Sequence, residues 1–353
     1  GGETHTYSLV SGTGDTDNLS FTLTTAGVLK SAQVFNYEVK NSYSIRVRTT
    51  DSGGLTYTGI FTILVTDVNE PPTAISPTSI NFQENQATGT TVTTFSVTDP
   101  DIGDTHTYEL ISGTGDTDNS SFTLTTAGVL KSAVVFNYEV KNSYSIRVKV
   151  TDSGDLTKEQ VVTINITNQN ETPTDIVLSN SSVAENSSTG TTVGTFTTVD
   201  PDAGNTFTYT LVAGTGDTNN TSFSLTTAGV LKTAEVFNYE VKNSYSIRVR
   251  STDQGGLFRE EVFVISVTNV NETPTNINLS NASIDENVPT GSTIGTLSTT
   301  DPDAGNTFTY TLVAGTGDTN NTSFFIDGAV LKSSEVFNYE VKNSYTIRVR
   351  STD

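Results

Sequence analysis

Apolar and polar residues alternate along most of this chain, in short runs separated by turn residues. In residues 144–150, for example, an apolar side chain falls at every second position, with Ser, Arg and Lys between them. This period of two is typical of β-strands that bury one face. Seven such runs occur between residues 72 and 172: 79–82, 91–97, 107–111, 121–124, 129–131, 144–150 and 160–166. No stretch has a helical period, and we expect at most one helical turn, over residues 134–141.

Clusters of turn-forming residues separate these runs. Examples are Gly-Thr-Gly-Asp at 113–116 and Asp-Ser-Gly-Asp at 152–155. Glycine, Asn, Asp and Ser favour tight turns because they tolerate unusual backbone angles or bond to their own backbone. Seven short strands in about 100 residues, with regular turn signals, predict an all-β fold of the Greek-key β-sandwich type.

The pattern repeats along the chain. The segment Phe-Asn-Tyr-Glu-Val-Lys-Asn-Ser-Tyr begins at residues 35, 136, 237 and 337, with spacings of 101, 101 and 100 residues. A fixed period of this size predicts a string of small domains. We expect four: the C-terminal part of repeat 1 (1–71), repeat 2 (72–172), repeat 3 (173–273) and the N-terminal part of repeat 4 (274–353). The chain therefore reads as a window from a longer protein.

Short linkers join the repeats. They are Asn-Glu-Pro-Pro at 69–72, Asn-Glu-Thr-Pro at 170–173 and Asn-Glu-Thr-Pro at 271–274, here called the first, second and third junctions. A linker that is short and contains Pro restricts the angle between its neighbours. We therefore expect the tandem sandwiches to form an elongated rod.

The charge balance is strongly acidic. Thirty-nine Asp and Glu face 18 Lys and Arg, giving a net charge of −21. This argues against nucleic acid and against direct insertion into, or binding to, an anionic membrane. No Cys is present, so the sequence excludes disulfides and thiolate metal sites.

The acids recur at fixed places in the repeats. Each repeat carries Glu-Asn near its first strand, Asp-Pro-Asp after its second, Asn-Tyr-Glu before its sixth and Thr-Asp after its sixth, and each junction carries Asn-Glu. Taken singly, such motifs are ordinary turn sequences. As an ordered set that recurs with the repeat, they point instead to divalent cation binding, because calcium prefers carboxylate, amide and backbone oxygens.

This set of motifs resembles that of cadherin repeats, and the resemblance covers essentially the whole chain. The segments 122–130, 136–139 and 144–148 are also similar to the central part of a cadherin repeat. The simple, Thr-rich repeats look more like bacterial cadherin-like surface proteins than animal cadherins.

The resemblance implies calcium ions between successive repeats, held by one set of residues at each junction. The first set is Asn36, Glu38, Asn69, Glu70, Asp99, Asp101 and Asp152. The second set is Glu84, Asn137, Glu139, Asn170, Glu171, Asp200, Asp202 and Asp253. The third set is Glu185, Asn238, Glu240, Asn271, Glu272, Asp301, Asp303 and Asp353.

Two departures from the family pattern bear on the number of ions. Asn stands where the family has Asp in Asp-x-Glu, and Glu stands where its linker has Asp. Complete junctions still supply six carboxylates, enough charge for three divalent cations. We therefore expect two or three Ca²⁺ per junction, with an affinity on the order of 0.1–1 mM.

Three functions remain open. The first is a calcium-rigidified stalk of adhesion repeats on the cell surface or otherwise outside the cell. The second is self-association, giving a surface filament or a homophilic contact, or binding to another surface protein. The third is a carbohydrate-binding sandwich, for which the lack of Trp is unfavourable.

No pattern indicates an enzyme. The chain has no Cys and no HExxH, and the complete third repeat has no His, so no nucleophile–base pair is evident. We interpret His5 and His106, which occupy equivalent positions in their repeats, as half-exposed strand residues, because Phe207 and Phe308 replace them further along.

Overall fold

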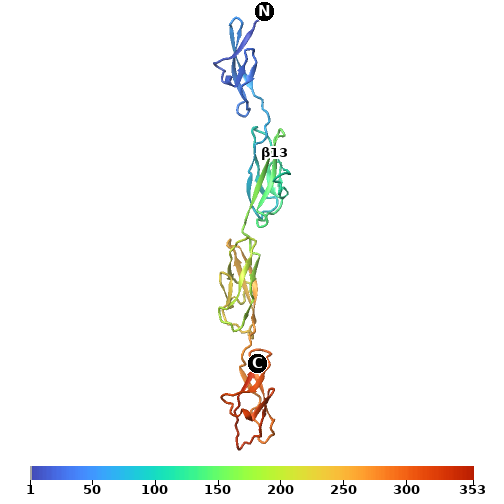
Figure 1. The fold of residues 1–353 in the computed structure, drawn as a ribbon, viewed down its shortest axis with the longest axis vertical. Coiled ribbons are helices and arrows are strands. Elements are labelled where there is room, and N and C mark those ends of the chain that lie inside the picture. Colours follow the sequence, from blue (N-terminus) through green and yellow to red (C-terminus); the bar gives the residue numbers. More distant parts are fainter. Residues whose placement is uncertain (1) are drawn as a thin grey trace. The chain divides into compact units, whose positions relative to one another are not determined.

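A computed structural model describes residues 2–353, and in this range the chain forms short β-strands and four single-turn 3₁₀-helices. The chain divides into two compact units, residues up to Gln169 and residues from Asn170 onward. In Figure 1 the first unit runs from blue to green and the second from yellow-green to red. Each unit contains two of the repeats predicted from the sequence.

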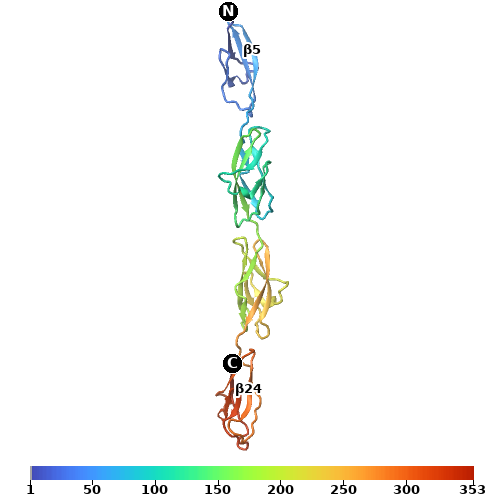
Figure 2. The same cartoon turned by 90° about the vertical axis from the view of Figure 1, so that its right-hand side faces the viewer.

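The first unit begins with a partial repeat that forms two small sheets. Its elements are β1 (His5–Leu9), η1 (Asn18–Ser20), β2 (Phe21–Leu23), β3 (Leu29–Ser31), β4 (Ser42–Asp51) and β5 (Thr56–Leu64). The sheet orders are β1-β4-β5 and β2-β3. Phe21, Tyr43 and Ile45 form a small core between these sheets. The hairpin of β4 and β5, labelled at β5 in Figure 2, leads into the first junction.

The second half of this unit is a complete sandwich. Its elements are β6 (Ala74–Ser76), β7 (Ser79–Gln83), β8 (Thr91–Thr94), β9 (Ser96–Thr98), β10 (Thr107–Leu110), η2 (Asn119–Ser121), β11 (Phe122–Leu124), β12 (Val129–Ser132), β13 (Ser143–Thr151) and β14 (Thr157–Thr167). One sheet has the order β10-β13-β14-β7, and β11-β12-β8 with the pair β6-β9 forms the opposite layer.

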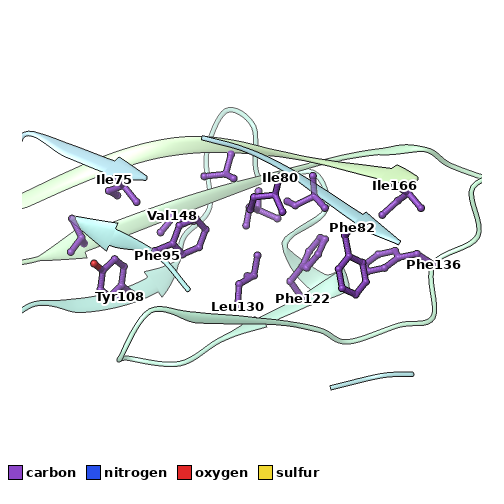
Figure 3. Packing of buried hydrophobic residues seen from close by; sticks show 14 residues of the cluster. Ile75, Ile80, Phe82, Phe95, Tyr108, Phe122, Leu130, Phe136, Val148 and Ile166 are labelled. Carbon is purple, nitrogen blue, oxygen red and sulfur yellow. The ribbon is translucent and has the colours of Figure 1, made fainter. Parts of the chain in front are cut away.

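The alternation of the sequence explains this core. Along β13, Ile146, Val148 and Val150 are fully buried, and the intervening side chains point outward. Opposite them, Phe95 and Leu130 close the core from the second layer, as Figure 3 shows. Burying an apolar side chain of this size stabilises the fold by roughly 1.5–3 kcal/mol.

The second unit repeats this architecture. Its first sandwich consists of β15 (Asp175–Leu178), β16 (Ser182–Ala184), β17 (Thr192–Val199), β18 (Thr208–Leu211), η3 (Asn220–Ser222), β19 (Phe223–Leu225), β20 (Val230–Thr233), β21 (Ser244–Thr252) and β22 (Phe258–Thr268). The sheet orders are β15-β17-β20-β19 and β16-β22-β21-β18. As in the second repeat, a short early strand (β16) runs parallel to the last one (β22).

The last repeat is again partial. Its elements are β23 (Asn276–Leu279), β24 (Thr293–Thr300), β25 (Thr309–Leu312), η4 (Asn321–Ser323), β26 (Phe324–Asp327), β27 (Val330–Ser333) and β28 (Val349–Thr352). The sheet orders are β23-β24-β27-β26 and β25-β28. β24, labelled in Figure 2, is one of the two inner strands of the four-stranded sheet.

The predicted all-β fold of tandem sandwiches is confirmed, with differences in detail. The sequence missed β6, which pairs with β9 in one sheet before the chain crosses to the other sheet at β7. The predicted strand 91–97 is interrupted at Phe95, and its two parts have different partners: β8 pairs with β12, and β9 pairs with β6. The expected helical turn is one turn closed by Lys141 N–H donating to Asn137 O. The four domain boundaries stay a prediction.

Candidate metal centres at the repeat junctions

The Glu of the Glu-Asn motif is buried and tied to the backbone. Glu84 is fully buried, and its two carboxylate oxygens accept hydrogen bonds from Tyr138 N–H and Gln169 N–H, both at 2.7 Å. Glu185 does the same with Tyr239 N–H at 2.7 Å and Val270 N–H at 2.8 Å. This Glu therefore holds the Asn-Tyr-Glu turn and the start of the next linker at one place.

The Asp-Pro-Asp motif ties the linker to the following repeat. Asp101 N–H donates to Asp99 Oδ1 (3.1 Å), and Asp101 Oδ2 accepts from the linker Glu70 N–H at 2.8 Å. In the last repeat, Asp303 N–H donates to Asp301 Oδ1 (2.9 Å) and Glu272 N–H donates to Asp303 Oδ2 (2.6 Å). The linker glutamates are thereby directed toward the Asp-Pro-Asp carboxylates.

The Asp of the Thr-Asp motif meets the linker Asn. Asn69 Nδ2 donates to Asp152 Oδ2 (3.1 Å), and the other oxygen of Asp152 accepts from Gly154 and Leu156 N–H. A Cβ at Gly154 would overlap the Asn69 carboxamide, so this turn needs glycine for space. At the third junction Asn271 Nδ2 donates to Asp353 Oδ2 at 2.6 Å.

Two groups of carboxylates form at the first junction. Glu38, Asp67, Glu70 and Asp101 each place an oxygen within 4.8 Å of the others. Asp99, Asp104 and Asp152 form a second group by the same measure. Seven acids therefore lie around one junction: five from four of the recurring motifs, together with Asp67 and Asp104, which lie outside the motifs.

The third junction has one such group. Glu185, Glu240, Glu272 and Asp303 each place an oxygen within 4.8 Å of the others. Asp301 and Asp353 lie outside this group, bonded to Asp303 N–H and to Asn271.

The second set is divided between the two units, and each half keeps the local geometry of its motif. In the first unit, Glu84 makes the backbone bonds described above, and Glu139 belongs to the Asn-Tyr-Glu turn. In the second unit, Asn170 Nδ2 donates to Asp253 Oδ2 (2.9 Å), and Glu171 N–H donates to Asp202 Oδ2 (2.7 Å). Asp202 N–H donates in turn to Asp200 Oδ1 at 2.9 Å.

The Asn of Asn-Tyr-Glu has a local partner. The Oδ1 atoms of Asn36, Asn137 and Asn238 accept hydrogen bonds from the backbone N–H three residues later, at 2.7–2.8 Å. This residue therefore shapes the turn that carries Glu38, Glu139 or Glu240.

Several enclosed carboxylate oxygens have no hydrogen-bond donor among residues 2–353. At the first junction these are both oxygens of Glu38, with Glu70 Oε2 and Asp104 Oδ2. At the third junction they are Glu272 Oε2, Asp301 Oδ2 and Asp303 Oδ1, and Asp303 is only 6% exposed. Buried polar atoms are normally paired, and calcium accepts such oxygens as ligands. The donor set therefore fits divalent calcium.

Electrostatics at the two junctions point the same way. Partial desolvation, with repulsion from Glu38, Asp101 and Asp67, raises the pKa of Glu70. Desolvation, followed by repulsion from Glu185, Glu272 and Asp303, raises the pKa of Glu240. A positive ion bound beside Glu70 or Glu240 would offset the repulsion from the neighbouring carboxylates.

Three residues of the first junction escaped the sequence reasoning. Asp67 stands where Asn168 and Asn269 occupy the other linkers, and Asp104 stands where Asn205 and Asn306 occupy later repeats. The interpretation of His106 as a half-exposed strand residue is wrong. It lies before β10, its side chain is 12% exposed, and its Nε2 is 2.8 Å from Asp99 Oδ2. Position-by-position comparison of the repeats could have singled out all three.

Tandem Greek-key sandwiches with acidic, linker-centred clusters define a class of modular β-protein. A family model for the cadherin domain matches residues 78–167 and 179–268. The chain belongs to the cadherin family, whose domains bind calcium between successive repeats.

Relatives and solved structures agree with this assignment. Mouse protocadherin Fat 4 is 29% identical over 358 residues, covering 96% of this chain and 7% of that protein. The Drosophila melanogaster protocadherin-like wing polarity protein stan is 28% identical over 312 residues, covering 83% of this chain and 9% of that protein. The chain thus spans less than a tenth of these relatives. Because both are animal proteins, the expected bacterial type gains no support.

Structural neighbours show the fold. Extracellular cadherin domains 1–4 of protocadherin gamma B7 superpose with a TM-score of 0.66 at 20% identity, covering 99% of this chain and 88% of theirs. The protocadherin gamma B4 extracellular domain gives a TM-score of 0.62 at 21% identity, covering 99% and 58%.

Proposed function

We propose that this chain is a run of extracellular adhesion repeats whose junctions are stiffened by calcium, within a large cell-surface protein. The enclosed, unpartnered carboxylate oxygens at the first and third junctions carry this proposal. The four-acid group at each of these junctions draws on the preceding repeat, the linker and the following repeat, so an ion bound there would join all three.

The charge of the clusters explains why an ion would matter mechanically. Like charges within 5 Å repel one another, and the repulsion grows as water is excluded. Without a cation, each linker would relieve this repulsion by moving away from its neighbours. With two or three Ca²⁺ per junction, the same carboxylates would hold the linker and fix the angle between repeats.

Magnesium fits these clusters less well. It demands a small octahedral shell and keeps its waters, whereas calcium accepts six to eight oxygens in flexible geometry. The glutamates of the linkers reach far enough to offer both oxygens, which suits the larger ion.

Calcium titration by calorimetry on the whole chain, with small-angle scattering before and after chelation, tests the proposal. We expect saturable binding in the range of 0.1–1 mM and a change from a flexible to an extended particle. Each occupied site should stabilise the fold by about 2.7 kcal/mol at 100 times its dissociation constant. The absence of binding at millimolar calcium would mean that the acids serve only as turn residues.

Self-association is the second candidate function. A solved relative, protocadherin gamma B7 domains 3–6, is described as a cis-dimer, and its fold matches this chain with a TM-score of 0.63 at 20% identity. Sedimentation of the chain in calcium over a wide concentration range tests the idea. A strict monomer at all concentrations would remove it, and silence on a glycan array would remove the carbohydrate-binding alternative.

An extracellular place is part of the proposal. It draws support from solved neighbours described as extracellular domains. Among the described residues, no helix has the length and apolar character needed to cross a membrane.

A further inference from the structure

The first and third junctions match in one carboxylate group and differ in the other. Each has a group of four acids centred on its linker glutamate, Glu70 or Glu272. The three-acid group of Asp99, Asp104 and Asp152 occurs only at the first junction within the described part of the chain. The four-acid groups have equal numbers of acids, although Asp67 belongs to the first and Glu185 to the third, so the three-acid group is the larger difference in charge between the two junctions.

A single sequence position causes this difference. The residue three positions after the Asp-Pro-Asp motif is Asp104 in the second repeat, Asn205 in the third and Asn306 in the fourth. Asp and Asn have nearly the same shape, but Asp offers only acceptors, whereas Asn also offers an NH₂ donor.

The neighbours of this position show the consequence. In the third repeat, Asn205 Nδ2 donates to Asp200 Oδ1 at 3.2 Å, so the amide itself supplies a partner for the carboxylate. In the second repeat, Asp104 can donate nothing, and its Oδ2 is enclosed without a donor from any described residue. Three negative charges therefore converge where the third repeat has two charges and a neutral donor. At the third junction the equivalent residue, Asn306, is also neutral, but its enclosed Nδ2 has no acceptor among the described residues.

His106 is a hydrogen-bond partner for one carboxylate of this group. Its Nε2 lies 2.8 Å from Asp99 Oδ2, and the Asp99 side chain is only 5% exposed. Phe207 and Phe308 hold this position in the later repeats and cannot bond to the carboxylate. His106 holds Asp99, while Asp104 Oδ2 keeps its acceptor capacity.

We propose that Asp104 makes the first junction bind calcium more tightly than the third, so that the junctions fill in a fixed order as calcium rises. The inference rests on the proposed function, because it ranks sites that the proposed function assigns. Ligand charge is one of the two properties that tune the affinity of calcium sites. An extra carboxylate also raises the repulsion that the ion relieves.

Amide hydrogen exchange on the whole chain measures each junction separately. Peptides covering residues 66–72 and 267–273 report the protection of the first and third linkers as free calcium is raised. We expect the first linker to reach half-protection at about tenfold lower calcium than the third. Asp104→Asn should bring the first midpoint close to the third and leave the third unchanged.

Two further variants complete the test. Asn306→Asp should lower the midpoint of the third linker alone, and it keeps the test valid if Asp104→Asn folds poorly. Asp155→Asn, in the same turn as Asp152 but outside the group, should leave both midpoints in place. The ranking would be overturned if both linkers of the unsubstituted chain reached half-protection at the same calcium concentration. It would also be overturned if the substitutions at positions 104 and 306 left these concentrations unchanged. Failure of calcium to protect either linker would instead overturn the proposed function.

Discussion

Replacing Glu185 by Gln should destabilise the third repeat even without calcium, whereas replacing Glu240 by Gln should not. Both residues belong to the four-carboxylate group of the third junction. Glu185, however, is 2% exposed and accepts backbone hydrogen bonds from Tyr239 and Val270. Glu240 is exposed, and its carboxylate faces other acids.

The expected magnitude follows from these bonds. Gln keeps one acceptor oxygen and puts an NH₂ donor against the second backbone N–H, so one bond of a charged carboxylate is lost. Such a bond contributes about 1.5–3 kcal/mol, and the donor left unpaired adds to the loss. In a domain of this size, each kcal/mol corresponds to a shift of about 4–8 °C in melting temperature.

The assay compares the two variants in chelator and in calcium. Because a multidomain chain does not unfold in one step, we would follow hydrogen exchange in peptides around Tyr239 and Val270. Glu185→Gln should speed exchange in both conditions. Glu240→Gln should exchange no faster than the unsubstituted chain in chelator, because it removes a like charge from the group, and it should lose only the protection that calcium adds. Equal behaviour of the two variants in chelator would refute the division into a structural and a ligand carboxylate.

Three further predictions concern the junctions. Gly154→Ala should weaken calcium binding at the first junction, because a Cβ there overlaps Asn69. Gly53→Ala, at the matching turn of the first repeat, should not weaken it. Calorimetry would measure the calcium affinity of each variant, and equal effects would contradict the prediction. In chelator, acidification from pH 7 to about 5 should raise the melting temperature measured by circular dichroism, because the pKa values of Glu70 and Glu240 are raised and their contribution is lost as pH rises through them; a fall over this window would count against mutual repulsion. Magnesium at the same concentration should leave both linkers unprotected in hydrogen exchange, and equal protection would show that the sites do not select for ion size.

The all-β sandwich fold could be predicted from the sequence because the alternation along β13 and β14 leaves only one face of each strand to bury. It could not anticipate β6, because residues 74–76 are too few to show a period and their pairing with β9 depends on the return of the chain. The one-residue break between β8 and β9 has no counterpart in β17 or β24, which also have two partner strands and are continuous, and no local pattern of the sequence records it.

The candidate site was predictable in its motifs and less so in its membership. Resemblance supplied Glu38, Glu70 and Asp101, which the structure brings together, but the linker acid beside them, Asp67, was overlooked because the other linkers carry Asn there. Asp301 and Asp353 carry the right motifs and lie outside the third group: Asp301 Oδ1 and Asp353 Oδ2 accept bonds from protein donors, while Asp301 Oδ2 has no donor among the described residues. Side-chain direction, which motifs do not encode, decided these cases.

Because the repeats are nearly identical, the few residues that differ between them at the junctions indicate where the junctions differ in charge and in hydrogen bonding. A substitution such as Asp104 for Asn would be costly in a calcium-free protein, because it puts a third carboxylate beside Asp99 and Asp152 and removes a donor. Its neighbour His106 offsets part of that cost with one bond to Asp99 but leaves Asp104 Oδ2 without a donor among the residues described. A cation bound at this group would compensate the remaining charge.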